Sequence, residues 1–486
     1  MLAVSVNKTG RKAIMWLLAV MSVSLIASMQ PALAFDPVAP FVDPLQTTPI
    51  VLVSGVTLPG DSDPAPCPVR KDFTTPLSLQ DAVDLALCNN PQIKATWAAI
   101  KVQAGMLGEA RAAYLPSLSM STNNLKTHTT YPKSNFTGNE VDGQAISATL
   151  SWRLFDFGGR SANLESANRL LLAAIDHHDT LLQTTLSAVV QAYFDAHTAM
   201  ATLQAKEQDE ADARSTLETA QRRQARGMDS RGDTLQAITA LAKASLEKNR
   251  AEGAYQKALS VLVYSIGVSP QTHLILADDL RDKDNLDLKN LEDWMQIAEK
   301  SYPEILAMRA KWESDKQKII STRSDGLPTV DFMASSYQNG YPGQGLSPTQ
   351  ARVSSLGISI NFPLFDGFST TYKIRTAEAQ AEEDEAILHD TEHNTLMEVV
   401  KAYADAVSSL QNLHASENLL NAARESMESS KRKYEKGVAD ILEMLNTQSA
   451  LADAQQERIR CLGEWRGARL KLLASVGQLG RSALSP

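Results

Sequence analysis

The sequence predicts a mainly α-helical fold with a small β part, in which long helical hairpins and pairs of strands each occur twice. Three observations predict it. Landmark residues recur at a fixed offset, short segments alternate apolar and polar residues, and long proline-free stretches repeat apolar residues at steps of three and four. The first observation indicates a tandem duplication, the second indicates strands, and the third indicates long amphipathic helices.

Residues 1–34 have the pattern of a secretory signal peptide. A positively charged start precedes the apolar run Ala13–Ala27, and Ala32-Leu33-Ala34 provides small residues for cleavage. The alternative is an N-terminal membrane anchor, but this run is short for a membrane span, and prolines follow it instead of charged residues. We therefore expect cleavage after Ala34, which leaves residues 35–76 as a Pro-rich N-terminal extension.

The charge balance of the chain argues against a nucleic-acid-binding protein. The formal net charge is −9, and removal of residues 1–34 takes away three positive charges, so the mature charge is −12 (−9 − 3). Nucleic-acid binding depends on basic surfaces, which an acidic chain of this kind does not favour. No later stretch is long and apolar enough for a membrane helix, so a place in a membrane would require a β-barrel.

The rest of the chain is one unit present twice. The segment 192–196 (AYFDA) returns as 402–406 (AYADA), an offset of 210 (402 − 192), and the same offset relates Gly227 to Gly437. Agreement of this kind at many landmarks indicates a tandem duplication. The predicted divisions are a first repeat 77–270, a linker 271–285, a second repeat 286–480 and a C-terminal tail 481–486.

Each repeat is expected to contain two strands. Ile146–Leu154 alternates apolar and polar residues, and Leu356–Phe362 is its counterpart. Alternation of this kind places the two residue sets on opposite faces of a sheet, and the aromatic residues that end the apolar sets suit the rim of a lipid-facing band. A soluble β-sandwich edge is the alternative. The four strands are expected near 116–130, 142–155, 327–341 and 350–365.

Four strands cannot close a barrel within one chain, and an open sheet edge is not tolerated in lipid. Several copies must therefore pool their strands. Two copies would give eight strands, whose interior is nearly filled by side chains, whereas three copies would give twelve strands and an opening.

The long helical stretches are expected to form two hairpins. Residues 160–226 contain no proline, and a helix of that length would extend about 100 Å at 1.5 Å per residue. Gly227 and Gly437 interrupt the two helical patterns at equivalent positions. Because glycine tolerates the left-handed backbone that ends a helix, we expect these glycines at the hairpin tips.

Short motifs follow one another along the chain in an order that the duplication repeats. These motifs are Leu79-Gln80-Asp81-Ala82, Asn90-Pro91, Leu115-Pro116, Leu327-Pro328, Leu154-Phe155-Asp156-Phe157-Gly158, Leu364-Phe365-Asp366-Gly367 and Tyr434-Glu435-Lys436-Gly437. By these motifs, from about Leu77 to Gly477, the chain resembles the TolC-like outer-membrane efflux and secretion proteins.

The resemblance implies a homotrimer with a twelve-stranded outer-membrane β-barrel and a helical tunnel that extends into the periplasm. It implies partnership with a periplasmic adaptor (a membrane fusion protein) and an inner-membrane transporter. The chain would then be the exit duct of a tripartite efflux or type I secretion system, and it looks most like the CyaE-like branch of type I secretion. It implies no cofactor and no enzymatic activity.

The family closes its tunnel at the periplasmic tip with acidic residues and a network tied to a tyrosine. By this resemblance Tyr434 is the tyrosine, and Asp233 and Glu443 are aperture acids. The chain departs from the family at Ala439, where some members have a locking arginine, and at Asn446, where they have a second acid. The alternative is that the two acids only stabilise the first turns of their helices.

The resemblance also points to the hairpin tips as the surface that contacts the adaptor. The tip residues are Gly227, Met228, Gly437 and Val438. A three-fold ring of carboxylates beside such tips would attract cations.

Cys67 and Cys88 lie close together in the sequence of an exported protein and are expected to form a disulfide. A loop of that size would contribute about 3 kcal/mol of stability. Two unpaired thiols are the alternative. The third cysteine, Cys461, lies on a helical stretch and is expected to be a small packing residue.

Two rival functions remain open from sequence. His389 and His393 have a spacing that can hold a metal, but the glutamate of an HExxH motif and a third ligand are missing. An exported coiled-coil scaffold without a pore would explain the helices, although it leaves the duplicated alternating segments without a role.

Overall fold

The computed structural model describes residues 45, 47, 75–130, 132, 138–277, 290–339 and 351–480. The chain divides into Met1–Gln46 and Thr47–Pro486, and every element below belongs to the second unit. The expected signal peptide 1–34 and tail 481–486 lie outside the described residues, as do most of the expected extension 35–76 and residues 278–289 around the expected linker.

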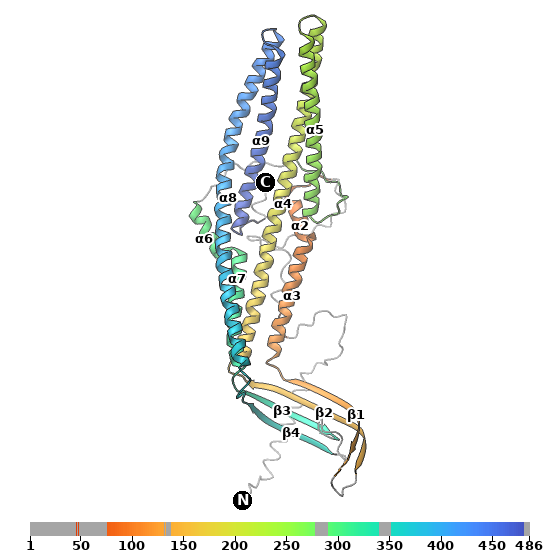
Figure 1. Cartoon of the computed structure of the whole chain (residues 1–486), viewed down its shortest axis with the longest axis vertical. Coiled ribbons are helices and arrows are strands. Elements are labelled where there is room, and N and C mark those ends of the chain that lie inside the picture. The colour runs from red at the N-terminus through yellow and green to blue at the C-terminus, as the bar shows by residue number, and fades with distance from the viewer. Residues whose placement is uncertain are drawn as a thin grey trace. The chain divides into compact units, whose positions relative to one another are not determined.

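The predicted fold class is confirmed, because long helical hairpins and one four-stranded sheet make up the described chain (Figure 1). Helices α4 and α8 contain 67 residues each, and α5 and α9 contain 35 each. The helices are α2 (Leu79–Asn89), α3 (Pro91–Ala112), α4 (Gly159–Ala225), α5 (Arg231–Ser265), α6 (Leu291–Ser301), α7 (Pro303–Ser324), α8 (Ser369–Glu435) and α9 (Ile441–Ser475).

The shorter helices line the longer ones on the side nearer the sheet. Helix α3 packs on α4, and α7 packs on both α4 and α8. Pro91 and Pro303 occupy the first turn of α3 and α7, where the missing amide hydrogen costs nothing. In Figure 1 the free ends of the α4–α5 and α8–α9 hairpins lie at the opposite end of these helices from the strands.

The sheet is antiparallel throughout, with the order β1-β2-β3-β4. Its strands are β1 (Ser117–Thr129), β2 (Asn139–Phe155), β3 (Thr329–Gln338) and β4 (Arg352–Asn361). The register places small hydroxyl residues opposite each other on one face, for example Thr149 opposite Ser335 and Ser335 opposite Ser355. Because side chains alternate along a strand, Leu118 and Leu356 lie on the other face, and they are 73% and 74% exposed.

Strands β1 and β4 are the edges of the sheet. Within the described residues, each of them pairs with a strand on one side only. An unpaired edge presents a row of backbone donors and acceptors that another strand can satisfy.

The repeated segments found in the sequence lie in the two largest hydrophobic clusters. Ala192, Tyr193 and Ala196 of α4 belong to one cluster, in which the Tyr193 hydroxyl donates to the Leu77 carbonyl at 3.1 Å. Their counterparts on α8 pack in the other cluster, beside the side chain of Trp465 on α9. The duplication therefore reuses the same helix face to build both cores.

None of the helices in the described ranges combines the length and the apolar character that a membrane span requires.

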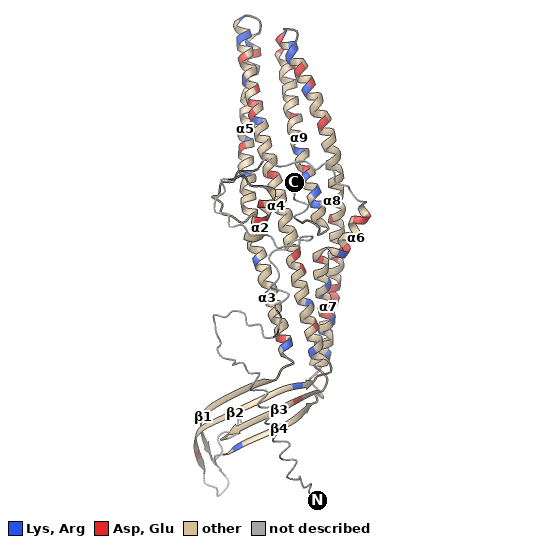
Figure 2. Ribbon diagram, turned by 180° about the vertical axis from the view of Figure 1, so that it is seen from behind, with Lys and Arg blue, Asp and Glu red and all other residues tan. Residues whose placement is uncertain are grey.

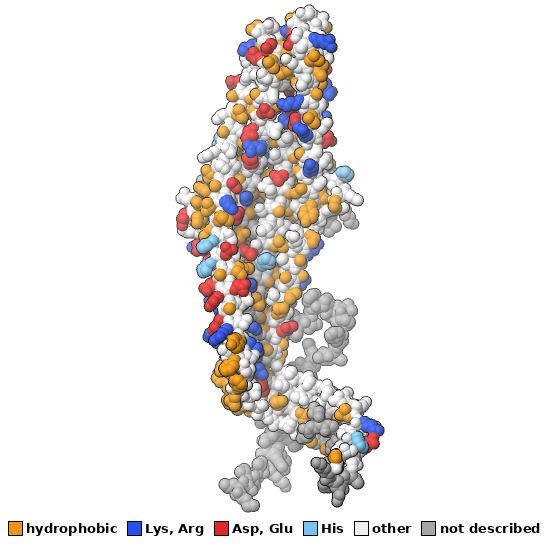
Figure 3. Space-filling view, in the orientation of Figure 1, with side chains coloured by type: hydrophobic (Ala, Val, Ile, Leu, Met, Phe, Trp, Pro, Cys, Tyr) orange, Lys and Arg blue, Asp and Glu red, His pale blue; other side chains and the backbone are white. Residues whose placement is uncertain are grey.

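The surface differs along the molecule. Charged side chains are spread over the helices, whereas the strands carry few of them (Figure 2). Apolar side chains gather where the sheet meets α8 (Figure 3). The most exposed of these are Phe362, Leu364, Phe365, Phe368 and Tyr372, with exposed fractions of 59% to 93%.

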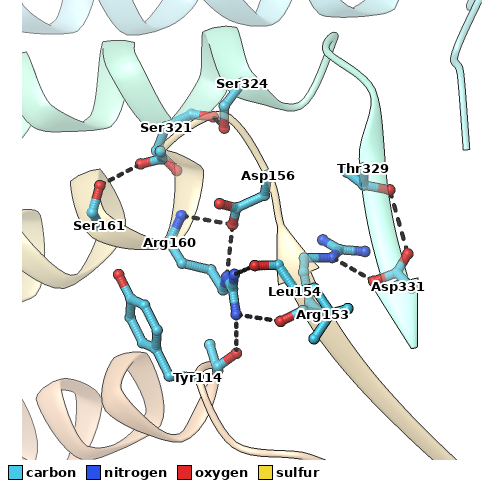
Figure 4. A network of polar contacts seen from close by, with 12 residues as sticks. Tyr114, Arg153, Leu154, Asp156, Arg160, Ser161, Ser321, Ser324, Thr329 and Asp331 are labelled. Atoms are coloured by element: carbon cyan, nitrogen blue, oxygen red, sulfur yellow. Dashed lines mark hydrogen bonds and ion pairs between the residues drawn. The ribbon is translucent and has the colours of Figure 1, made fainter. Parts of the chain in front are cut away.

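The two strand-to-helix junctions are built differently. At the first, Arg160 donates to the Asp156 carboxylate at 2.9 Å and to the Arg153 and Leu154 carbonyls at 2.7 and 3.2 Å (Figure 4). At the second, the Asp366 carboxylate accepts hydrogen bonds from the Thr370 amide and hydroxyl, at 2.7 and 2.5 Å. The first junction therefore ties strand and helix together through one arginine.

Candidate gate at the hairpin tips

Both hairpin tips use the same turn. Gly227 and Gly437 have φ values of +71° and +74°, a conformation that residues with a Cβ rarely adopt. After each glycine, an amide hydrogen bonds back into the preceding helix: Met228 to the Arg223 carbonyl and Val438 to the Lys433 carbonyl, both at 2.9 Å. The structure thus places the predicted glycines at the ends of the two hairpins.

A network of three side chains joins the two tips. The Tyr434 hydroxyl of α8 donates to Asp229 Oδ2 at 2.6 Å. Arg223 of α4 donates through Nε to both Asp229 oxygens at 3.0 Å, and through Nη1 to the Tyr434 carbonyl at 3.1 Å. The Arg223 guanidinium carbon also lies 4.7 Å from the centre of the Tyr434 ring, a cation–π distance.

This network is buried. Tyr434 is 2% exposed, and the side chains of Arg223 and Asp229 are 14% and 8% exposed. Burial, followed by the hydrogen bond to Asp229 and its negative charge, raises the pKa of Tyr434 well above its usual value. The phenol is therefore neutral, keeps its proton and donates a hydrogen bond to the carboxylate. Apolar neighbours of Tyr434 complete the cluster, namely Ala220, Ala237, Ile441 and Met444.

Asp233 makes a capping box with Ser230 at the start of α5. The Ser230 amide donates to Asp233 Oδ2 at 2.7 Å, and the Asp233 amide donates to Ser230 Oγ at 3.2 Å. Such reciprocal bonds stabilise a helix N-terminus. Within one chain, the Asp233 carboxylate is thus held by its own helix.

Glu443 lies in the first turn of α9, where its amide donates to Asp440 Oδ1 at 2.8 Å. Its Oε1 accepts hydrogen bonds from Ser430 at 3.2 Å and from Lys433 at 3.3 Å. The Glu443 carboxylate therefore contacts side chains near the end of α8. A role of Asp233 and Glu443 in an aperture ring stays a prediction, because such a ring needs several chains.

Arg223 and Asp229 are not among the residues predicted from sequence. The repeat offset could have found them, because Asp229 is the counterpart of Ala439 and Arg223 is the counterpart of Lys433. The signal was a difference between the repeats: an aspartate, Asp229, follows the first tip glycine, whereas the uncharged Ala439 stands at the equivalent place in the second repeat. The arginine of the network, Arg223, belongs to the first hairpin, like Asp229.

The other residues predicted from sequence lie outside the network of Arg223, Asp229 and Tyr434. Met228 and Val438 are 59% and 78% exposed at the tips. Cys88 takes part in a disulfide, while Cys67 lies outside the described residues. Cys461 is a buried free cysteine, in agreement with a packing residue.

In the structure, Glu392 lies beside the histidine pair of α8. His389 Nδ1 lies 3.2 Å from Glu392 Oε2. The described part of the chain contains no group of three or more His, Cys, Asp or Glu side chains able to hold a metal ion.

Comparison with known proteins gives consistent matches. The family described as "Outer membrane efflux protein" matches residues 82–268 and 294–478. Protein CyaE of Bordetella pertussis is 34% identical over 429 residues, which cover 87% of this chain and 90% of that protein. The alkaline protease secretion protein AprF of Pseudomonas aeruginosa is 26% identical over 416 residues, covering 82% and 85%.

A solved structure supports the same fold. The outer membrane protein VceC of Vibrio cholerae superposes with a TM-score of 0.71 at 18% identity, covering 82% of this chain and 96% of that one.

Proposed function

The chain belongs to the outer membrane efflux protein family, and we propose that it is the outer-membrane duct of a type I system that secretes a polypeptide. The resemblance to TolC-like channels and their CyaE-like branch is confirmed. As a family member, the chain is an outer-membrane channel protein that extends into the periplasm.

The name of AprF supports a polypeptide cargo. AprF is named as an alkaline protease secretion protein, and the chain matches it over most of both lengths. A drug or a metal ion would pass the same kind of duct, because the inner-membrane transporter selects the cargo.

We also propose a homotrimer that works with a periplasmic adaptor and an inner-membrane transporter. Three copies of a four-stranded sheet with two open edges would supply twelve strands and leave no unpaired edge. The exposed Met228 and Val438 side chains at the tips offer the adaptor an apolar contact.

The duct is closed at rest by a latch formed by Arg223, Asp229 and Tyr434. The observation that carries this part of the proposal is the 2.6 Å hydrogen bond from Tyr434 to Asp229, which joins two hairpins that would have to separate for the tip to widen. Asp233 and Glu443 would then lie near the opening as acids exposed to passing cations.

Deletion of the gene in the organism of origin tests the cargo class. We expect one or more polypeptides to disappear from the culture medium and to remain in the cells, with recovery when the gene is restored. Unchanged secretion together with new sensitivity to dyes or antibiotics would assign the duct to drug efflux instead.

Cross-linking tests the partners. A photoreactive residue in place of Met228 or Val438 should capture the adaptor in living cells, whereas the same residue in place of Leu118 on the sheet should not. Equal capture from the sheet position would contradict an adaptor contact at the tips.

A further inference from the structure

Two aspartates lie in contact between α7 and α8 of the second repeat. Asp384 is 3% exposed, and its Oδ1 accepts a hydrogen bond from Lys311 Nζ at 3.0 Å. The Asp315 and Asp384 carboxyl groups lie close enough to interact with each other. Two ionised carboxylates have no hydrogen to share, so a hydrogen bond between them requires a proton on one of them.

The remaining oxygens of this pair lead to the same requirement. Asp315 Oδ2 and Asp384 Oδ2 are buried and accept no hydrogen bond from any amide, hydroxyl or ammonium group among the described residues. A buried acceptor without a donor is costly. Two carboxylates beside the single ammonium of Lys311 carry one excess negative charge, and one shared proton removes it.

The first repeat shows that the fold itself does not need charges here. Through the repeat offsets, Asp315 corresponds to Gln103, Asp384 to Ala174 and Lys311 to Ala99. Ala174 packs against an apolar cluster between α3 and α4 that includes Ile100. The ionisable group is therefore an addition that is specific to the second repeat.

Water can reach Asp315 from one side. Asp315 lines a cavity of about 700 Å³ between α7 and α8, so a proton can exchange with solvent. Arg169 of α4, which also packs on α7, is held by Glu165 and Glu313 at 2.8 and 2.7 Å. The other charged or titratable residues that line the cavity are Lys318, Asp325, Tyr372 and Lys373.

We propose that Asp315 and Asp384 share one proton, with Lys311 as the counter-charge, and form a protonation-sensitive tie between α7 and α8. Loss of the proton places two negative charges against each other in a largely buried site and loosens the contact of α7 with α8. These residues of α7 and α8 make no contact with Arg223, Asp229 or Tyr434 among the contacts described above. The proposal does not depend on the proposed cargo.

The direction of the pH effect follows from the titration of the pair. Burial, together with the hydrogen bond and charge of Asp384, raises the pKa of Asp315 to about 7. Burial also favours a higher pKa for Asp384, but the hydrogen bond from Asp315 and the Lys311 ion pair outweigh it and leave that pKa below its usual value.

The folded chain therefore holds a proton on Asp315 that the unfolded chain releases near pH 3.8. This contribution to stability is complete below that pH and is lost as the pH rises to about 7.

Thermal unfolding of the full mature protein in detergent tests the proposal. The side-chain amide introduced by Asp315→Asn would donate a hydrogen bond to Asp384 at every pH. We expect the Tm of this variant to rise relative to the wild type as the pH increases from about 5 to about 8. The control, Asp325→Asn, lines the same cavity and should keep the wild-type pH profile.

Infrared spectroscopy gives a second readout that does not need a stable variant. Near pH 6 we expect the carbonyl stretch of a protonated carboxylic acid in the wild type and in Asp325→Asn, and less of it in Asp315→Asn. The proposal is overturned if the wild type shows no such band. It is also overturned if calcium raises the Tm of the wild type but not of Asp315→Asn, because a divalent cation would then bridge the carboxylates.

Discussion

At the tip of the first hairpin, Arg223 and Asp229 form a buried ion pair, whereas the same positions of the second hairpin hold Lys433 and Ala439. Lys433 instead reaches Glu443 in an exposed pair, with side chains 53% and 43% exposed. The backbone turns are alike at the two tips. The two copies thus share the same backbone turn but differ in their charges, because only the first tip has the buried Arg223–Asp229 ion pair.

The phenol of Tyr434 completes this asymmetry, because its counterpart in the first repeat is Gln224. The first hairpin supplies the buried arginine and aspartate, and the second supplies the phenol that donates a hydrogen bond to that aspartate. The junctions beside the sheet differ in a similar way, with Arg160 in the first repeat and Thr370 in the second. In both places the same backbone carries different polar contacts in the two copies.

Asp229→Ala is expected to have the largest effect on the latch. It leaves the Arg223 guanidinium buried without its carboxylate and the Tyr434 hydroxyl without its acceptor. Breaking a buried ion pair from one side costs about 3–5 kcal/mol. We expect local opening of the tips to become easier by about this amount, as measured by hydrogen exchange of the tip amides.

The same variant should also raise the mean single-channel conductance in planar bilayers. Glu443→Ala, which removes an exposed acid of the other hairpin, is the matched control for hydrogen exchange of the tip amides and should change the free energy of local opening by less than about 1 kcal/mol. Equal changes in the free energy of local opening in the two variants would show that the buried ion pair does not stabilise the tips more than the exposed one.

Tyr434→Phe should have the second largest effect. It keeps the buried ring and removes only the hydrogen bond to the Asp229 carboxylate. A hydrogen bond to a charged group contributes about 1.5–3 kcal/mol. Hydrogen exchange should show a smaller loss of protection than in Asp229→Ala. Combining the two changes should add little, because both remove the same contact.

Ser230→Ala tests a feature that the two tips share. Ser230 caps α5 and Asp440 caps α9, each through a hydrogen bond from the amide three residues later. Loss of such a cap costs about 1 kcal/mol. We expect Ser230→Ala and Asp440→Ala to reduce amide protection in the first turns of their own helices by similar amounts. A loss that spreads to the opposite hairpin would contradict this.

Lys433→Ala should have the smallest effect. Its ion pair with Glu443 is exposed to solvent, and pairs of this kind contribute about 0–1 kcal/mol. Protection of the tip amides should be nearly unchanged, and high salt should remove what difference there is. An effect as large as that of Arg223→Ala would show that the second tip carries a latch of its own.

The sequence by itself determined the elements of this protein and their duplication. Alternation along Ile146–Leu154 and the helical spacing after Arg160 reflect the backbone geometry of the same segment, so they can be read locally. The hairpin tips followed in the same way, because Gly227 and Gly437 supply a left-handed residue where a helix must end.

Only the tertiary structure decided which side chains meet. Asp229 and Tyr434 are 205 residues apart, and Asp384 and Lys311 are 73 apart. Their contacts depend on how α8 and its neighbouring helices pack, and no local periodicity records that packing. The resemblance pointed to Tyr434, but its partners Arg223 and Asp229 could be identified only from the packing of the two hairpins. The physical reason is that burial of the charges, which sequence does not record, makes the loss of one partner costly.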